Sequence, residues 1–256
     1  MCFDALELRG VSFAYPNGRV SALRPLNGVD FKVSAGEFVS IIGPSGSGKS
    51  TIFRLISGLE QPDEGTILLN GSFKANRLGC VGYMPQKDLL MPWRTVLDNA
   101  ALPLEIKGDG KEEAREKVLK LLGEFGLKDV EGHFPAELSG GMKQRVSFLR
   151  TILSGSDLLL LDEPFSALDA ITRLGMQEWL LRQWSKWQKT ILFITHDVDE
   201  AMYLSDRILV LPKDGGPIQE VRVPLKRPRA LRDLSGRYAA ALKEQLLSAL
   251  RPGTGV

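Results

Sequence analysis

Cysteine is scarce in this sequence of 256 residues. Its two cysteines, Cys2 and Cys80, do not form a spacing typical of a zinc site or a disulfide framework. We therefore expect a fold that is stable without disulfides, as in a reducing compartment. An excess of one charge is also missing, because 33 Lys and Arg residues nearly balance 31 Asp and Glu residues. The resulting formal charge of +2 lacks the basic footprint of a nucleic-acid-binding protein.

Long hydrophobic runs are absent as well. No apolar run approaches the roughly 20 residues that a membrane-spanning helix needs. Asp4, Glu7 and Arg9 interrupt the first apolar residues, so no secretory signal peptide is predicted. The hydrophobic content of 43% is ordinary for a globular protein, and the chain is long enough to bury a sizeable core. These features predict a soluble chain, whatever its partners are.

The most informative stretch is rich in glycine and fits the P-loop pattern G-x-x-x-x-G-K-[S/T]. It reads Gly43, Pro44, Ser45, Gly46, Ser47, Gly48, Lys49, Ser50, Thr51. An apolar, strand-like run precedes it at 38–42, and a helix-like run follows at 52–56. In that context the loop amides and the helix start can hold a polyphosphate. Lys49 would reach its β- and γ-phosphates, and the Ser50 hydroxyl is a Mg²⁺ ligand. A plain glycine-rich turn is the disfavoured alternative.

A second stretch places two carboxylates at the end of a buried strand. Four leucines at 158–161 are typical of a strand covered on both faces in a parallel sheet. Asp162 and Glu163 follow directly. Beside a phosphate loop, Asp162 suits a metal-binding role through a ligated water, and Glu163 suits a general base. Burial of two carboxylates without a cation would be costly, which weakens a purely structural interpretation.

Other candidate residues each have a structural alternative. Tyr15 could stack on an adenine or simply pack at a turn. Gln86 and His196 follow predicted strands, where ligand contacts gather in α/β sheets, but a surface glutamine and a structural histidine are common. Ser139, followed by Gly140 and Gly141, could begin a second phosphate-binding helix or act only as an N-cap.

The remaining pattern alternates strands and helices. We expect strands at 5–14, 29–33, 66–69, 80–84, 190–194, 206–211 and 217–223, and helices at 95–106, 111–125 and 172–187. A turn is expected at 16–18. Apolar residues from Leu231 to Leu250 are spaced three and four positions apart, which predicts a C-terminal amphipathic helix that docks on its own domain. The loop at 89–93 is unusually apolar, which favours either a partner surface or packing on the protein's own core.

In this order along the chain, the motifs resemble those of the ATP-binding subunit of an ABC transporter. Residues 43–51 match the Walker A motif, and 158–162 match Walker B with Glu163 beside it. Residues 138–142 match the signature motif, with Met142 in place of the usual glutamine. Tyr15 matches the A-loop, Gln86 the Q-loop, 166–169 the D-loop and His196 the switch histidine. The resemblance spans about residues 5–223.

The resemblance implies an α/β P-loop NTPase fold with a RecA-like core, an antiparallel β subdomain and an α-helical signature subdomain. The nucleotide-binding domain would span 1–230, with the helical subdomain inserted at about 87–156, and a C-terminal helix and tail would span 231–256. The implied cofactors are ATP and Mg²⁺. Implied catalytic residues are Glu163, His196 and Gln86; implied metal ligands are Ser50, Gln86 and Asp162; implied nucleotide contacts are Tyr15, Gly43, Pro44, Ser45, Gly46, Ser47, Gly48, Lys49, Ser50, Thr51, Ser139, Gly140, Gly141 and Asp169.

The same resemblance implies a head-to-tail homodimer with ATP between the protomers, bound to membrane permease subunits at the cytoplasmic face of the membrane. A solute-binding protein outside the cell would be an indirect partner, and no nucleic acid would be bound. The run at 83–96 resembles importers of nitrate, sulfonate, taurine and bicarbonate, and most closely those of thiamin-precursor pyrimidines. Leu89, Leu90, Pro92 and Trp93 would then help to dock the permease. The alternative class is a soluble ABC ATPase that acts on ribosomes or DNA.

Overall fold

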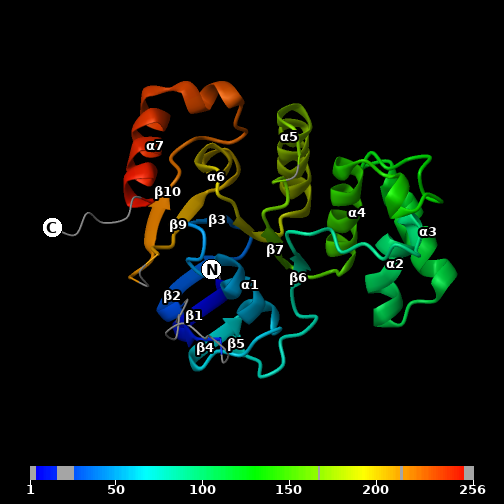
Figure 1. Cartoon of the computed structure of the whole chain (residues 1–256), viewed down its shortest axis with the longest axis horizontal. Coiled ribbons are helices and arrows are strands. Elements are labelled where there is room, and N and C mark those ends of the chain that lie inside the picture. The colour runs from blue at the N-terminus through cyan, green and yellow to red at the C-terminus, as the bar shows by residue number, and fades with distance from the viewer. Residues whose placement is uncertain (1–3, 16–25, 167, 214–215, 251–256) are drawn as a thin grey trace. The chain divides into compact units, whose positions relative to one another are not determined.

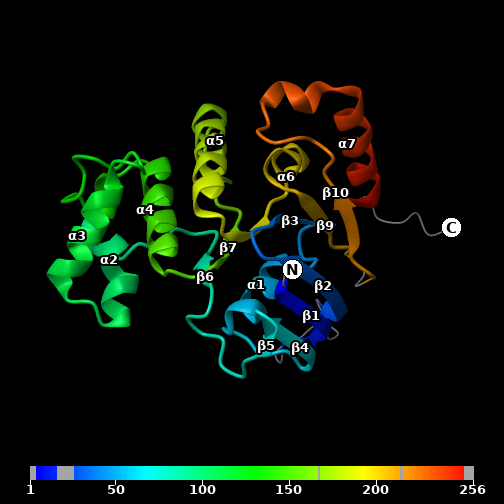
Figure 2. The ribbon, with the colours of Figure 1, turned by 180° about the vertical axis from the view of Figure 1, so that it is seen from behind.

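The computed structural model describes residues 4–15, 26–166, 168–213 and 216–250. The chain forms two compact units (Figures 1 and 2): Met1–Leu78 together with Trp187–Val256, and Gly79–Lys186. The turn predicted at 16–18, Ala167 of the D-loop and the end of the tail lie outside the described residues. Within the described residues, no helix has both the length and the apolar character needed to cross a membrane.

The first unit contains an antiparallel sheet near its N-terminal end. Its strands are β1 (Asp4–Phe13), β2 (Leu26–Ser34), β4 (Glu64–Leu69) and β5 (Ser72–Phe73), in the order β2-β1-β4-β5. Alternate residues of β2 are buried, namely Leu26, Val29, Phe31 and Val33, although an irregularity shifts the register near its start. This alternation is expected where one face of a sheet covers a core and the other faces water. The predicted antiparallel β subdomain is therefore present.

A second, mostly parallel arrangement of strands carries the glycine-rich loop. In this unit β3 (Phe38–Ile42) pairs in parallel with β8 (Thr190–Ile194) on one side and with β9 (Arg207–Val210) on the other. β10 (Gln219–Arg222) then pairs antiparallel with β9. Every residue of β3 and β8 is buried, as expected for strands covered on both faces. α1 (Lys49–Ser57) begins seven residues after β3 ends.

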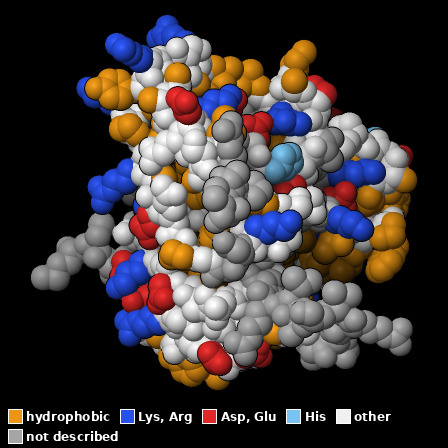
Figure 3. Space-filling view, turned by 60° about the vertical axis from the view of Figure 1, so that its left-hand side comes forward, with side chains coloured by type: hydrophobic (Ala, Val, Ile, Leu, Met, Phe, Trp, Pro, Cys, Tyr) orange, Lys and Arg blue, Asp and Glu red, His pale blue; other side chains and the backbone are white. Residues whose placement is uncertain are grey.

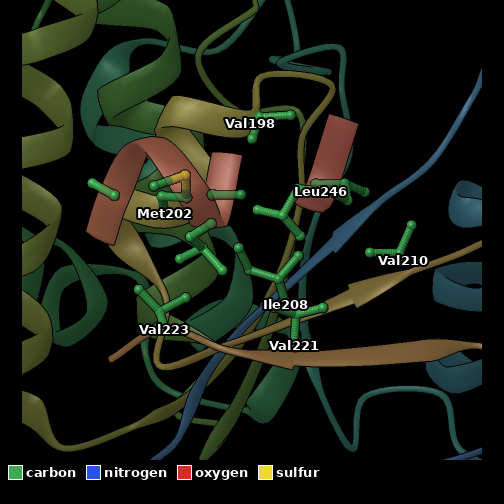
Figure 4. Packing of buried hydrophobic residues seen from close by; sticks show 11 residues of the cluster. Val198, Met202, Ile208, Val210, Val221, Val223 and Leu246 are labelled. Atoms are coloured by element: carbon green, nitrogen blue, oxygen red, sulfur yellow. The ribbon is translucent and has the colours of Figure 1, made fainter. Parts of the chain in front are cut away.

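The C-terminal segment packs against this same unit. α6 (Val198–Leu204), the 3₁₀ turn η2 (Leu231–Ser235) and α7 (Arg237–Leu250) lie next to one another (Figure 1). Ala239, Leu242 and Leu246 of α7 are buried with residues of α6, β9 and β10 (Figure 4). The predicted docking of the C-terminal helix on its own domain is confirmed. Its predicted start at Leu231 is wrong, because the extended backbone of Gly236 separates η2 from α7.

The second unit combines a strand pair with a group of helices. β6 (Gly82–Met84) and β7 (Leu158–Asp162) are parallel. The helical elements are α2 (Val96–Lys107), α3 (Lys111–Leu122), the turn η1 (Pro135–Glu137), α4 (Gly140–Leu153) and α5 (Ala170–Trp187). Trp179 of α5 packs edge-on against Phe125 and Phe148. This aromatic cluster is a core contact, which supports the packing role that tryptophans most often have.

On the face that Figure 3 shows, Lys and Arg side chains are interspersed with Asp and Glu side chains. This mixture agrees with the near-zero net charge of the sequence.

Candidate functional site

The glycine-rich loop in the first unit has the geometry of an anion cradle. Gly46 and Gly48 have φ angles of +81° and +96°, which residues other than glycine rarely adopt. A Cβ on Gly43 would lie 2.5 Å from the Leu211 carbonyl oxygen, so the backbone approach there also requires glycine. Gly48 caps α1 without a side-chain hydrogen bond, which leaves the first helix amides directed toward the loop.

Two polar side chains inside this loop show what it can hold. Lys49 is buried, and its Nζ donates to the carbonyl oxygens of Gly43 and Pro44 at 2.8 and 2.9 Å. The Ser47 hydroxyl is buried and has no hydrogen-bond partner among the described residues. A buried ammonium and an unsatisfied hydroxyl beside open amides are the donors that a phosphate group requires. The residues present therefore fit a polyphosphate.

Tyr15 reaches this loop from the end of β1. Its hydroxyl lies 3.4 Å from the Thr51 hydroxyl, and its ring packs edge-on against Phe13 at a centroid distance of 4.8 Å. Its side chain remains 45% exposed. The packing interpretation of Tyr15 is thus met, and stacking on an adenine stays a prediction for the exposed part of the ring.

His196 stands two residues beyond the end of β8 and is exposed. The next residue, Asp197, caps the short helix α6 by accepting hydrogen bonds from the backbone amides of Asp199 and Glu200. Sequence reasoning missed α6, because seven residues are too few to show a helical period. The Asp197 cap followed by two acidic residues was the available signal.

In the second unit, the structure brings Gln86 and Glu163 together. The register of the parallel pair places Met84 opposite Leu161. Gln86 and Glu163 each follow two residues after one of these paired residues. The Gln86 Nε2 donates to the Glu163 Oε2 at 3.1 Å. Glu163 has a φ of +45°, an uncommon conformation that often marks functional residues. Asp162, the last residue of β7, is buried.

The predicted signature and D-loop residues also occupy the second unit. The Ser139 hydroxyl caps α4 by accepting from the Met142 amide at 3.3 Å. Gly140 is exposed, whereas Gly141 packs so closely that a Cβ would meet the Thr172 methyl at 3.1 Å. Asp169 accepts from the amides of Ile171 and Thr172, and hydrogen bonds from Thr172 hold the pKa of Asp169 below its ordinary value. The N-cap interpretation of Ser139 is thus met, without excluding a phosphate contact.

The apolar loop that follows Gln86 is held by two residues that sequence reasoning missed. Asn99 is fully buried; its amide accepts from the Met91 amide at 2.8 Å and donates to the carbonyls of Met91, Arg94 and Thr95. Arg150 of α4 donates to the carbonyls of Asp88 and Leu89 at 2.6 and 2.9 Å. Burial lowers the pKa of Arg150 from its ordinary value. No local sequence signal identifies these roles, because their partners are backbone atoms.

This anchored loop presents apolar side chains to the surface. Trp93 is 73% exposed and Leu89 is 60% exposed, and Pro92 is exposed as well. Leu90 is buried, so its predicted place in a docking surface is wrong: it belongs to the core of the second unit. The alternative that Trp93 is a core residue is also wrong.

Comparisons with known proteins identify relatives along the whole chain. A family model described as ABC transporter matches residues 26–166. The formylaminopyrimidine import ATP-binding protein ThiZ of Halalkalibacterium halodurans is 42% identical, over 98% of each chain. The aliphatic sulfonates import ATP-binding protein SsuB 1 of Rhodococcus jostii is 45% identical, over 96% of this chain and 93% of its own.

Solved structures show the same fold. The ATP-binding cassette MJ0796, in a dimeric structure of a post-hydrolysis state bound to ADP and Pi, has a TM-score of 0.76. It is 32% identical and covers 86% of this chain and 100% of its own. The cbiO1 protein of Clostridium perfringens, part of the ABC transporter complex cbiONQ, also has a TM-score of 0.76 at 21% identity. The predicted α/β P-loop NTPase fold is confirmed.

Proposed function

Because this chain belongs to the ABC transporter family as an ATP-binding subunit with ATPase activity, we propose that it energises the import of a small solute through a separate membrane permease. The observation that carries the proposal is the similarity to an import ATP-binding protein from end to end, over 98% of both chains. We propose a formylaminopyrimidine-type solute, which also agrees with the sequence at 83–96.

In this proposal, the first unit binds the nucleotide. The Tyr15 ring stacks on the base, and the amides of the loop at 43–51 surround the phosphates. Lys49 supplies a charge at the outer phosphates, and the unsatisfied Ser47 hydroxyl becomes a donor to them. The oxygens of Ser50, Asp162 and Gln86 are ligands of the type that Mg²⁺ prefers. The bound ion would neutralise charge that develops on the transferred phosphoryl group.

Glu163 is the proposed general base. Its carboxylate accepts a hydrogen bond from Gln86, so a water positioned by Glu163 would also lie close to Gln86. Glu163 is half-buried, whereas every residue of β7 before it is buried. His196 would contact the γ-phosphate from the end of β8.

We propose that two copies assemble head to tail. Ser139, Gly140 and Gly141 would then complete the phosphate site of the other protomer, and Asp169 would lie near the dimer interface. This arrangement gives a role to both phosphate-binding helix starts of one chain. The proposed domain limits are 1–230, with a helical subdomain at about 87–156, and 231–256.

The exposed loop gives the proposed contact with the permease. Leu89, Pro92 and Trp93 are apolar and exposed on a loop, where polar residues are usual. Because the loop follows Gln86 directly, one movable element could report the nucleotide state to the permease. The subunit would accordingly lie on the cytoplasmic face of the membrane, with a solute-binding protein as an indirect partner.

The test is uptake in cells that express this chain together with a candidate permease. We expect accumulation of labelled formylaminopyrimidine that disappears when Glu163 is replaced by glutamine. Uptake of an aliphatic sulfonate instead would keep the importer assignment and change the solute. Co-purification with ribosomes or DNA, with no permease bound, would contradict the importer assignment and favour the soluble alternative.

A further inference from the structure

The first unit contains a cavity of about 770 Å³ that is separate from the phosphate loop. It lies between the segment at 224–228, the turn η2 and the first residues of α7. The charged residues of its lining are Lys226, Arg232, Asp233 and Arg237. None of these residues belongs to the nucleotide site described above. Its volume is within the usual range for a small-molecule site.

The lining of this cavity carries three cationic side chains and one carboxylate, so positive charge is in excess. The side chains of Lys226, Arg232 and Arg237 form no ion pair or hydrogen bond with any described residue. The acidic residue Asp233 is already engaged, because its Oδ2 accepts from the Ala230 amide at 2.7 Å. Three cations around one hollow raise the local potential and attract an anion.

A second cavity of the same unit provides a contrast. It has about 780 Å³ and is also rich in charge, but its cations are largely paired. Arg207 pairs with Glu37 and Glu220, and Lys32 pairs with Glu7. Ion pairs that satisfy one another leave little attraction for a ligand. The cavity beside α7 lacks such pairing, so its cations remain available.

The wall behind these cations is fixed in place. Arg229 is buried and donates to the carbonyls of Met202, Tyr203 and Ser205 at the end of α6. Arg227 donates to the Leu204 carbonyl and to Asp206. These bonds anchor the chain on both sides of Pro228, which lines the cavity. A wall that is already ordered loses less entropy when a ligand binds.

The remaining lining indicates the kind of ligand. Pro224, Leu225 and Ala239 form an apolar wall, and the Tyr238 ring is 82% exposed at the cavity. α7 has no acidic residue in its first turn, so the positive end of its dipole is not neutralised there. Arg guanidinium groups match phosphate oxygens in pairs, whereas an apolar wall and a ring suit an organic body.

We propose that this cavity binds a phosphate ester that carries an apolar or aromatic body. Lys226, Arg232 and Arg237 hold the phosphate, and Tyr238 contacts the body. The site is independent of ATP hydrolysis and of the solute that is imported. A soluble phosphate ester and the headgroup of an anionic lipid share this chemistry, and the experiment separates these two sources.

The test is a calorimetric titration in which phenyl phosphate is added to a parent protein that carries Lys49→Ala. This substitution disables the phosphate loop. In that background, Lys226→Gln, Arg232→Gln and Arg237→Gln are introduced together. We expect phenyl phosphate to bind roughly tenfold or more weakly, because charge-assisted hydrogen bonds are lost. The matched control replaces the exposed Lys111, Lys120 and Lys128 by glutamine, which removes the same charge from the second unit. We expect less than about a twofold change there.

Flotation with vesicles separates the sources. A lipid headgroup is the ligand if the parent floats with phosphatidylglycerol vesicles but not with phosphatidylcholine vesicles, and if the cavity variant floats with neither. In that case phenyl phosphate does not bind to the parent. The proposal is overturned if both variants weaken binding equally, or if the parent binds neither phenyl phosphate nor vesicles. ATP affinity of the cavity variant with Lys49 intact should stay unchanged, so a failure here leaves the proposed importer function standing.

Discussion

Single residues carry the proposed chemistry, and Glu163 is the first to test. Glu163→Gln should slow ATP hydrolysis roughly 10²-fold or more, because a general base is removed while the shape and the Gln86 contact are nearly kept. ATP affinity should stay close to that of the parent. Steady-state phosphate release and a nucleotide-binding titration measure the two effects.

The matched control for that variant is Lys49→Ala. It removes the buried ammonium of the phosphate loop and should weaken ATP binding itself. Turnover that survives nearly intact in Glu163→Gln would show that another group acts as the base. ATP affinity that is unchanged in Lys49→Ala would contradict the phosphate site.

Arg150 is a positioning residue that links α4 to the loop beyond Gln86. Arg150→Lys can reach only one of the two carbonyls of Asp88 and Leu89 that the guanidinium holds together. We expect faster amide exchange across 88–95 and unchanged ATP affinity, because the phosphate loop belongs to the other unit. Hydrogen exchange with peptide resolution measures the exchange across 88–95. Arg182→Lys on the exposed face of α5 is the control. Equal exchange in both variants would exclude this role.

At the scale of elements, the pairing of β1 with β2 makes the stability of the fold depend on pH. Glu7 and Lys32 are directly opposite each other in the register. Hydrogen bonds from Arg9 and Lys32 lower the pKa of Glu7 to about 2. A carboxylate with a lowered pKa stabilises the fold above its ordinary pKa, and this contribution is lost as the pH falls toward the lowered value.

Glu7→Gln should therefore destabilise the protein at neutral pH and flatten the loss of stability between about pH 4.5 and pH 2. Urea midpoints measured at several pH values test this expectation. Glu64→Gln removes an exposed carboxylate of β4 and should leave the slope of the parent in place. A variant curve parallel to the parent curve would show that other carboxylates dominate.

For the whole molecule, assembly with a permease should depend on Trp93. Trp93→Ala should impair binding to the permease or uncouple transport from hydrolysis, because tryptophan often dominates interface energy. The isolated chain should melt at nearly the parent temperature, since this side chain is 73% exposed. Ile106→Ala removes an equally exposed apolar side chain of α2 and serves as the control. A large fall in melting temperature with permease affinity unchanged would contradict docking.

Dimer formation is the second property of the whole molecule. With ATP bound and hydrolysis blocked by Glu163→Gln, light scattering should give twice the mass of one chain. Without nucleotide, the mass should be that of a single chain, because in the proposed arrangement the bound nucleotides supply part of the interface. Adding Ser139→Arg should prevent the dimer, since a bulky cation would replace the small hydroxyl at the start of α4. A dimer that forms equally without ATP would contradict the sandwich arrangement.

The sequence by itself determined the family, the phosphate loop and most strands and helices, because these depend on local patterns. Glycines at fixed spacing, a leucine run before two carboxylates and an amphipathic period need no distant partner to be recognised. Tertiary structure decided what depends on contacts between distant residues. It buried Leu90 and exposed Trp93, and it placed Arg150 and Asn99 on backbone carbonyls. It also left three cations unpaired around one cavity. Burial and backbone hydrogen bonding arise from packing, which residue spacing alone does not encode.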